Sequence, residues 1–171
     1  MARTLIGLVM AGLLLAGCDS GPEVPDGFTE AEAGPVTFAH PEDWREGSPT
    51  GGAELQIEGP EGAGGARTGL QVFVADEAGD PAARATALAA ELRTSFEEFE
   101  VVGQSDTEVD GAEAATLLEY TFTRPEGGTV HSWDVLAEGP GGEHVIFRVE
   151  GSEEDLDEDT AQEILDTLSF S

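Results

Sequence analysis

The 171-residue chain contains no lysine, no asparagine and a single cysteine, and its 7 basic residues, all arginine, face 36 acidic ones. The resulting formal charge of −29 leaves no basic surface to neutralise phosphates, which argues against nucleic-acid binding. One cysteine excludes an intramolecular disulfide framework and a zinc site built on several cysteines. Without lysine the chain has no P-loop lysine, no Schiff-base lysine and no Ser-Lys dyad.

The first eighteen residues have the pattern of a bacterial secretion signal. Arg3 precedes an apolar stretch over residues 5–15, which is shorter than the roughly 20 residues that a bilayer-spanning helix needs. The stretch ends in Leu-Ala-Gly17-Cys18, which resembles a lipobox with cleavage between Gly17 and Cys18. The alternative is an ordinary signal peptide cut nearby, which leaves Cys18 as a stray thiol.

A lipobox implies that Cys18 carries a diacylglyceryl group and becomes the new N-terminus. Two acyl chains suffice for stable anchoring, whereas one is marginal. We therefore expect residues 1–17 to be a signal peptide and Cys18 to hold the protein in the lipid bilayer, at the outer face of the cell membrane. The 36 acids favour solubility and repel the domain from anionic lipids, so the anchor must supply the membrane attachment.

Residues 18–34 are expected to form a lipidated N-terminus and a flexible tether, because they show neither helical nor strand periodicity. Residues 35–171 are patterned throughout and have the length of one ordinary domain. Strand patterns occur in seven segments, at 36–40, 54–58, 69–75, 101–109, 112–123, 129–137 and 144–150. Asp110-Gly111 predicts a two-residue hairpin turn between the fourth and fifth of these.

Two helices are expected. The first has Asp80 as its N-cap and Pro81 as its first residue, and its apolar side chains from Ala85 to Phe99 share one face. The second is expected over residues 152–168, with docking on the sheet from about Thr160. Short loops between successive strands indicate antiparallel neighbours. The fold class is therefore α+β, an antiparallel sheet of about six or seven strands flanked by helices.

Several motifs in the predicted domain resemble a known family. Val36 to Trp44 is similar to an opening strand followed by a Pro-x-x-Trp turn, and Val109-Asp-Gly leads into a long strand that reaches Tyr120. Together with the mid-chain helix and the closing helix that ends near Phe170, this order resembles the Mog1/PsbP-like fold, an α/β/α sandwich. Within that fold it resembles the LpqN/LpqT-type lipoproteins of actinobacteria. The resemblance covers nearly all of residues 35–171 and implies no cofactor and no shared catalytic residues.

Three aromatic or imidazole side chains are candidate binding residues: Trp44, His131 and Trp133. His131-Ser132-Trp133-Asp134 holds the residue types of a catalytic triad, but on a strand the first and third point away from the second and fourth. Trp44 also fits a residue at the edge of the core.

No metal site is expected either. His40, His131 and His144 lie on separate predicted strands without local ligand spacing. The acids from Asp155 to Asp159 mimic the start of a calcium loop but fit a helix start better.

The sequence thus predicts a membrane-anchored extracytoplasmic lipoprotein with a non-catalytic domain that binds an unknown ligand or protein of the cell envelope. The alternative is a structural or assembly factor that holds a partner protein at the membrane, and a hydrolase is a distant third. A small-molecule site requires an apolar hollow, whereas a partner role requires an exposed apolar patch.

Overall fold

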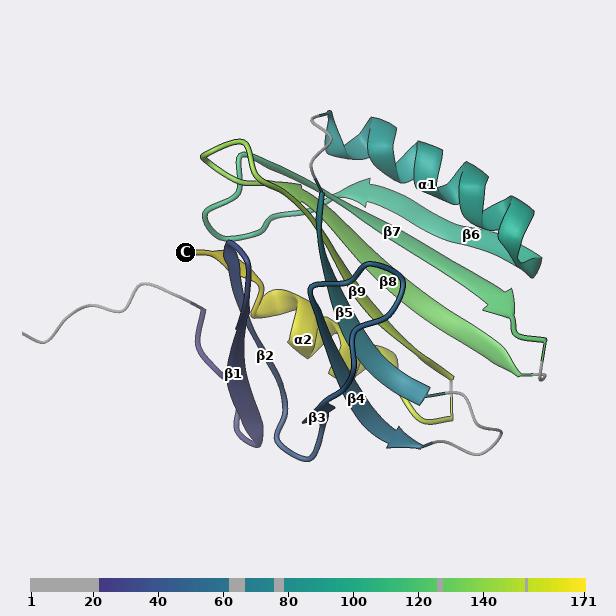
Figure 1. Ribbon diagram of the computed structural model, residues 1–171, viewed down its shortest axis with the longest axis horizontal. Helices are drawn as coiled ribbons and strands as arrows, with labels where there is room; N and C mark the ends of the chain where they lie inside the picture. Colours follow the sequence, from purple (N-terminus) through teal and green to yellow (C-terminus); the bar gives the residue numbers. More distant parts are fainter. Residues whose placement is uncertain (1–21, 62–66, 76–78, 126–127, 153) are drawn as a thin grey trace, which may run out of the picture.

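The computed structural model describes residues 22–61, 67–75, 79–125, 128–152 and 154–171 (Figure 1). The strands before the first helix are β1 (Phe28–Ala33), β2 (Val36–Pro41), β3 (Arg45–Glu46), β4 (Leu55–Glu61) and β5 (Arg67–Ala75). Helix α1 (Pro81–Ser95) is followed by β6 (Glu97–Asp106), β7 (Ala114–Thr123), β8 (Thr129–Glu138) and β9 (His144–Ser152). Helix α2 (Glu158–Asp166) and the short β10 (Ser169–Phe170) close the described chain.

The strands form two sheets. The larger has seven strands in the order β3-β4-β5-β9-β8-β7-β6, and all its pairings are antiparallel. The smaller has the order β1-β2-β10 and is also antiparallel. The predicted α+β class and antiparallel sheet are confirmed. The first predicted strand, however, lies in the smaller sheet.

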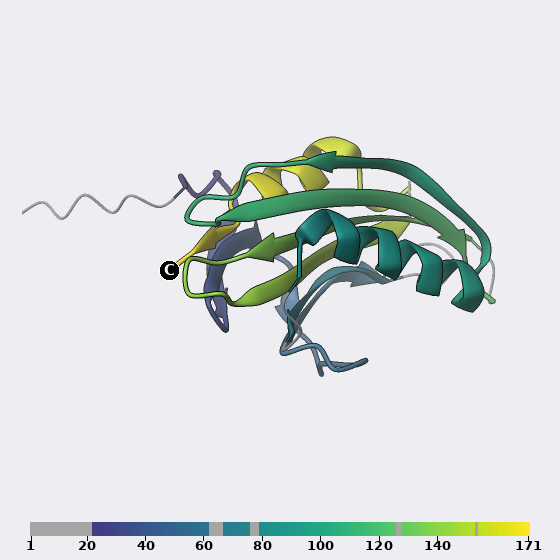
Figure 2. The same cartoon turned by 90° about the horizontal axis from the view of Figure 1, so that it is seen from above.

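The two helices pack on opposite faces of the seven-stranded sheet (Figures 1 and 2). Alternate residues of β8 divide between the two faces. Trp133, Val135 and Ala137 pack with α2 and the smaller sheet in a larger core, whereas Val130 and Leu136 pack with α1 in a smaller one. Most residues of β8 are therefore buried, on both faces of the sheet.

Each helix begins at an aspartate. The side chain of Asp80 accepts a hydrogen bond from the Ala83 amide, as the sequence predicts for α1. For α2 the prediction of a start at residue 152 is wrong, because Asp157 is the N-cap and accepts from the Thr160 amide. Ser152 instead ends β9, where its hydroxyl bonds the Asp155 carboxylate within a turn.

The predicted tether is too long. Residues 28–33 form β1, which pairs with β2 from Phe28↔Pro41 to Ala33↔Val36, and Gly34 makes the turn at φ 56°. This strand has few apolar residues, and pairing with β2 stabilises it more than its own pattern does. The domain therefore begins by residue 28, and not at residue 35.

The predicted turn at Asp110-Gly111 is confirmed, because the Ala112 amide donates to the Val109 carbonyl at 3.1 Å, but the predicted two-residue connection between the strands is too short. β6 ends at Asp106 and β7 begins at Ala114, so the connection is a longer loop. Within this loop Asp110 forms a parallel bridge with Ser169, and its carbonyl accepts from the Phe170 amide. The loop is therefore shaped by its contact with β10. The apolar face of α1 is also shorter than the sequence predicts, because α1 ends at Ser95 and Phe99 lies in β6.

Candidate functional site

The helices leave part of each face of the seven-stranded sheet uncovered. α1 contacts β6, β7 and β8, and α2 contacts β9 and β2. On the α1 side, the β5 and β9 residues Gln71, Phe73, Arg148 and Glu150 remain beside the helix. With Arg124, which follows β7, these five residues define a surface that we call the arginine half-face.

A hollow of about 450 Å³ lies on the arginine half-face. Its walls include Phe73, Phe96 and Phe122, and Thr50 forms part of the rim. The rings of Phe96 and Phe122 pack with their centroids 4.2 Å apart, and Phe73 remains partly exposed. The hollow therefore combines aromatic walls with charged and polar groups.

An ion pair between the 16% exposed Arg148 side chain and the buried Asp134 carboxylate underlies this surface. Asp134 has 0% exposure, and the Arg148 guanidinium donates to it twice, from Nε to Oδ1 at 2.9 Å and from Nη2 to Oδ2 at 2.6 Å. The Tyr120 hydroxyl donates to both carboxylate oxygens at 3.3 Å, and the Ser132 hydroxyl donates to Oδ1 at 3.1 Å. This carboxylate is thus fully satisfied, as a buried charge must be.

The surroundings of this ion pair shift two pKa values. Burial, reinforced by the negative charge of Asp134, raises the pKa of Tyr120 far above its ordinary value. Burial acts to lower the pKa of Arg148, but the adjacent Asp134 outweighs it and raises that pKa. Both side chains therefore keep their protons at neutral pH.

A second ion pair lies nearer the solvent. Arg124 Nη2 is 2.8 Å from Glu150 Oε1, with side chains 27% and 20% exposed. Burial raises the pKa of Glu150 above its ordinary value, although Arg148 and Arg124 oppose that effect. The Arg124 guanidinium carbon lies 6.0 Å from the Phe122 ring centroid, and that of Arg148 lies 5.5 Å from Phe73. The aromatic rings are therefore flanked by paired guanidinium groups.

A polar row continues the half-face toward β4. Gln71 Nε2 donates to Gln56 Oε1 at 3.2 Å, and the Thr50 hydroxyl donates to the same oxygen at 3.0 Å. Gln56 in turn donates from Nε2 to Glu58 at 3.0 Å. These contacts hold the amide groups in defined orientations at the rim of the hollow.

The predicted candidates lie elsewhere. Trp44 and Trp133 are 7% and 4% exposed and belong to the larger core, so their rings pack against other side chains. His131 stacks on Trp133 with ring centroids 3.9 Å apart, and its Nε2 lies 2.7 Å from Glu119 Oε1. Glu119, Thr121 and His131 define the histidine half-face, on the side of the sheet opposite the arginine half-face.

The predicted separation of the triad-like residues is confirmed. His131 and Trp133 stack together, while Ser132 bonds Asp134 on the other face. No group of three or more potential metal ligands occurs among the residues that the structure describes. Two acids of the α2 region form hydrogen bonds within the helix. Asp157 caps its N-terminus, and the Asp166 carboxylate accepts a hydrogen bond from the Gln162 side-chain amide. Gly17 and Cys18 lie outside the described residues.

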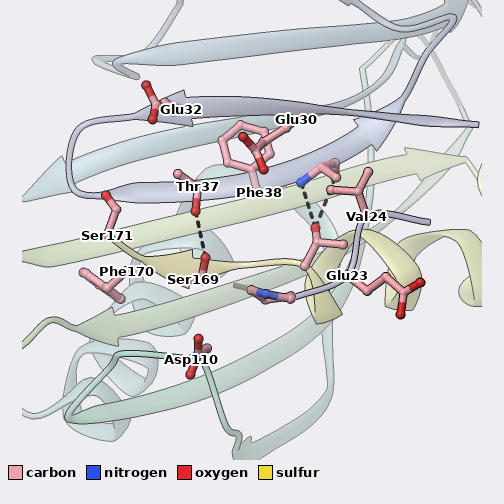
Figure 3. Close-up of a pocket in the computed structure, with 13 residues that line it drawn as sticks. Glu23, Val24, Glu30, Glu32, Thr37, Phe38, Asp110, Ser169, Phe170 and Ser171 are labelled. Atoms are coloured by element: carbon pink, nitrogen blue, oxygen red, sulfur yellow. Dashed lines mark hydrogen bonds between the residues drawn. The ribbon is translucent and has the colours of Figure 1, made fainter. Parts of the chain in front are cut away.

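A second hollow, of about 650 Å³, lies beside the smaller sheet (Figure 3). The Thr37 and Ser169 hydroxyls are 2.7 Å apart within it, and the Ala39 amide donates to Thr167 Oγ1 at 2.8 Å. Its carboxylates come from exposed residues, which are Glu23, Glu30, Glu32 and Asp110. These acids are well solvated and form no ion pair among the described contacts, so the arginine half-face is the better-built site.

Sequence reasoning missed the arginine half-face. One signal was available: Asp134 stands between Trp133 and Val135 in the largely apolar part of β8, where a charge is costly. The register that places Arg148 opposite Asp134 and Gln71 joins residues far apart in sequence. Only the paired sheet therefore reveals the cluster.

Comparison with known proteins supports the fold. No protein-family model and no curated protein matches the sequence. The solution structure of cyanobacterial PsbP (CyanoP) from Synechocystis sp. PCC 6803 is similar with a TM-score of 0.64 and 12% identity, over 92% of this chain and 99% of that chain. The chain therefore has a PsbP-like fold, as its sequence motifs predicted.

Two further structures share the architecture. The Pseudomonas aeruginosa protein PA94, described as a putative regulator of unknown function, has a TM-score of 0.53 and 19% identity, over 82% of this chain and 94% of that chain. A Bacteroides thetaiotaomicron VPI-5482 protein has a TM-score of 0.52 and 13% identity, over 80% of this chain but 45% of its own. At these identities the similarity establishes the fold alone.

Proposed function

We propose that this chain is a bacterial lipoprotein whose PsbP-like domain binds a ligand of the cell envelope without catalysing a reaction. The arginine half-face is the observation that carries this proposal. It offers an open hollow of about 450 Å³ with aromatic walls and fixed polar groups, which is the composition of a binding site. None of its described lining residues places a hydroxyl or thiol beside a histidine.

The rest of the described chain also favours binding over catalysis. The Ser132 hydroxyl is fully buried against Asp134, and His131 lies on the other face of the sheet. A nucleophile needs a base within hydrogen-bond reach and access to substrate. Ser132 has a carboxylate within reach but no access to substrate, and His131 is not available to it, so a hydrolase of the Ser-His type built on these residues is disfavoured.

Membrane attachment is proposed to occur through Cys18, after removal of residues 1–17. Among the described residues, no helix is both long and apolar enough to cross a bilayer. Residues 19–27 separate Cys18 from β1 and can span at most about 30 Å. A lipid on Cys18 would therefore keep the smaller sheet close to the outer face of the cell membrane.

The described surface favours a small ligand over a large partner protein. A partner role requires a contiguous exposed apolar patch. The exposed large hydrophobic residues in the described part of the chain are Val24, Val74 and Val102, which lie in three different segments. An assembly factor remains the second candidate, and co-purification of a stoichiometric protein partner would promote it.

Anchoring is tested by metabolic labelling with a palmitate analogue in a bacterium that processes lipoproteins. The native chain should be labelled and sediment with membranes, whereas Cys18→Ala should be unlabelled and either released or retained as the precursor. A labelled Cys18→Ala protein, or a native protein that is soluble and unlabelled, would refute the anchor.

Ligand binding is tested by native mass spectrometry of the whole protein extracted from its own host in detergent. We expect a bound small molecule on the native protein and its loss in Phe73→Ala, which removes one wall of the hollow. Thr121→Ala, on the histidine half-face, is the control and should keep the ligand. Equal occupancy in Phe73→Ala would place the ligand elsewhere.

A further inference from the structure

We propose that the arginine half-face binds a neutral saccharide, an inference that rests on the proposed ligand-binding function and specifies its chemistry. The site combines paired charges, amide groups of fixed orientation and half-buried aromatic rings. These three features, taken together, select a ligand that is uncharged, rich in hydroxyl groups and apolar on one side.

Charge is the first argument. Each guanidinium of the site already has a carboxylate partner, Asp134 for Arg148 and Glu150 for Arg124. An anion would have to displace a carboxylate while approaching a protein of formal charge −29. A cation would approach the Glu150 carboxylate beside two guanidinium groups, whose positive charges oppose its binding. A neutral ligand leaves both ion pairs intact.

The hydrogen-bonding groups of the site are the second argument. A guanidinium has five N–H donors, and the described contacts of Arg124 use Nη2 alone. The described contacts of Gln71 use Nε2, which leaves its Oε1 as an acceptor, and Glu150 bonds Arg124 through Oε1 and not Oε2. Donors and acceptors therefore lie close together. A hydroxyl group, which both donates and accepts, matches such a mixture better than a group limited to one role.

The aromatic walls and the size of the hollow are the third argument. Phe73 and Phe96 are half-buried, so each can cover the C–H face of a sugar ring while other hydroxyl groups reach the polar rim. The hollow of about 450 Å³ lies within the range of about 300–1,000 Å³ that is typical of small-molecule sites. A saccharide of one or two rings suits this volume.

The test is an NMR titration of the whole protein, purified with its own N-terminus in detergent. The probes are the disaccharides maltose, cellobiose, trehalose and N,N′-diacetylchitobiose at millimolar concentrations, with succinate and spermidine as charged probes. We expect at least one disaccharide to shift the amide signals of Gln71, Phe73 and Glu150. Succinate and spermidine should leave those signals in place.

Matched variants sharpen the titration. Gln71→Ala should weaken disaccharide binding about tenfold, because a hydrogen bond between the rim of the hollow and the ligand is lost. Thr121→Ala replaces a half-buried strand residue on the opposite face and should leave the affinity unchanged. Thermal melts of both variants check that each is folded. Equal affinities of the native protein and a folded Gln71→Ala would overturn the assignment.

The remaining outcomes separate this proposal from the proposed function. Shifts at the same residues with succinate or spermidine, and none with disaccharides, would overturn the saccharide class but support ligand binding at this site. If no probe shifts any amide signal, the saccharide class is also overturned. Mass spectrometry of protein from its own host then decides whether any ligand is bound. Disaccharide shifts confined to the histidine half-face would overturn the location.

Discussion

The two faces of the seven-stranded sheet are enclosed in different ways. On the α2 side the larger core packs Phe38, Trp133, Phe147 and Ile164 together with the smaller sheet, and the buried polar residues beside it, such as Thr68 and Thr167, carry no charge. On the α1 side the smaller core ends at the buried Asp134–Arg148 ion pair, beyond which the sheet is open. One face is therefore stabilised mainly by apolar contacts, while the other depends on a pair of charges as well.

This difference bears on the proposed binding site, which lies on the α1 side. A buried ion pair contributes little net stability relative to an apolar core, because desolvation offsets the attraction between the charges. A second role of Arg148, in shaping the open surface next to it, would account for the presence of this ion pair between β8 and β9. Asp134 is the one buried carboxylate among the residues that the structure describes, and it lies on the α1 side.

The largest expected effect comes from breaking the buried ion pair. Asp134→Ala leaves the Arg148 guanidinium without its partner and should lower the free energy of unfolding by about 3 to 5 kcal/mol, measured by urea denaturation. The double variant Asp134→Leu with Arg148→Met replaces both charges by apolar groups and should lose much less. A loss below about 1 kcal/mol for Asp134→Ala would show that the α1 side does not depend on this pair.

The next effect compares the two helices. Ile164 of α2 is fully buried, whereas Leu92 of α1 is 8% exposed at the margin of the smaller core. Truncation to alanine should cost about 2 to 5 kcal/mol at either position, with Ile164→Ala the more costly. Glu91→Ala, on the exposed side of α1, is the control and should change stability by no more than about 0.5 kcal/mol. A larger loss for Leu92→Ala would reverse the comparison.

A pH dependence should be found on the arginine half-face. Burial in the folded protein raises the pKa of Glu150 above its ordinary value of about 4.5, so the folded state holds this proton more tightly than the unfolded state. The associated stability is present below pH 4.5 and is lost as the pH rises through the folded pKa. In that window the native protein should lose stability relative to Glu150→Gln, measured by urea denaturation at several pH values. The prediction is contradicted if the free energies of unfolding of the native protein and of Glu150→Gln change with pH in the same way.

The smallest effect concerns the surface acids. The formal charge of −29 causes self-repulsion, which salt screens over a Debye length of about 8 Å at physiological ionic strength. Moderate NaCl or millimolar divalent cation should therefore raise the melting temperature. The cost of Asp134→Ala should change little with salt, because buried charges are poorly screened. A melting temperature independent of salt would show that the acids are too dispersed to destabilise the fold.

Much of the architecture follows from local sequence patterns. The Asp80-Pro81 start of α1 and the alternating strands β7, β8 and β9 agree with the prediction, because capping and side-chain alternation are properties of neighbouring residues. β1 was missed because its acid-rich sequence has little strand pattern, and its pairing with β2 forms it. Residue type alone makes Trp44 and Trp133 candidates for binding, but burial in the larger core removes both from the surface.

Sequence patterns suffice to predict the class of fold and the large negative charge. They also predict that His131 lies on the opposite face of the sheet from Ser132 and Asp134. Tertiary structure alone decided where an open surface remains, because the sites covered by α1 and α2 depend on packing between distant segments. The ion pairs Arg148–Asp134 and Arg124–Glu150 also form only in the tertiary structure, through the register of the strands and the position of the segment after β7. A charged residue in an apolar strand signals a partner, but strand pairing determines which residue that partner is.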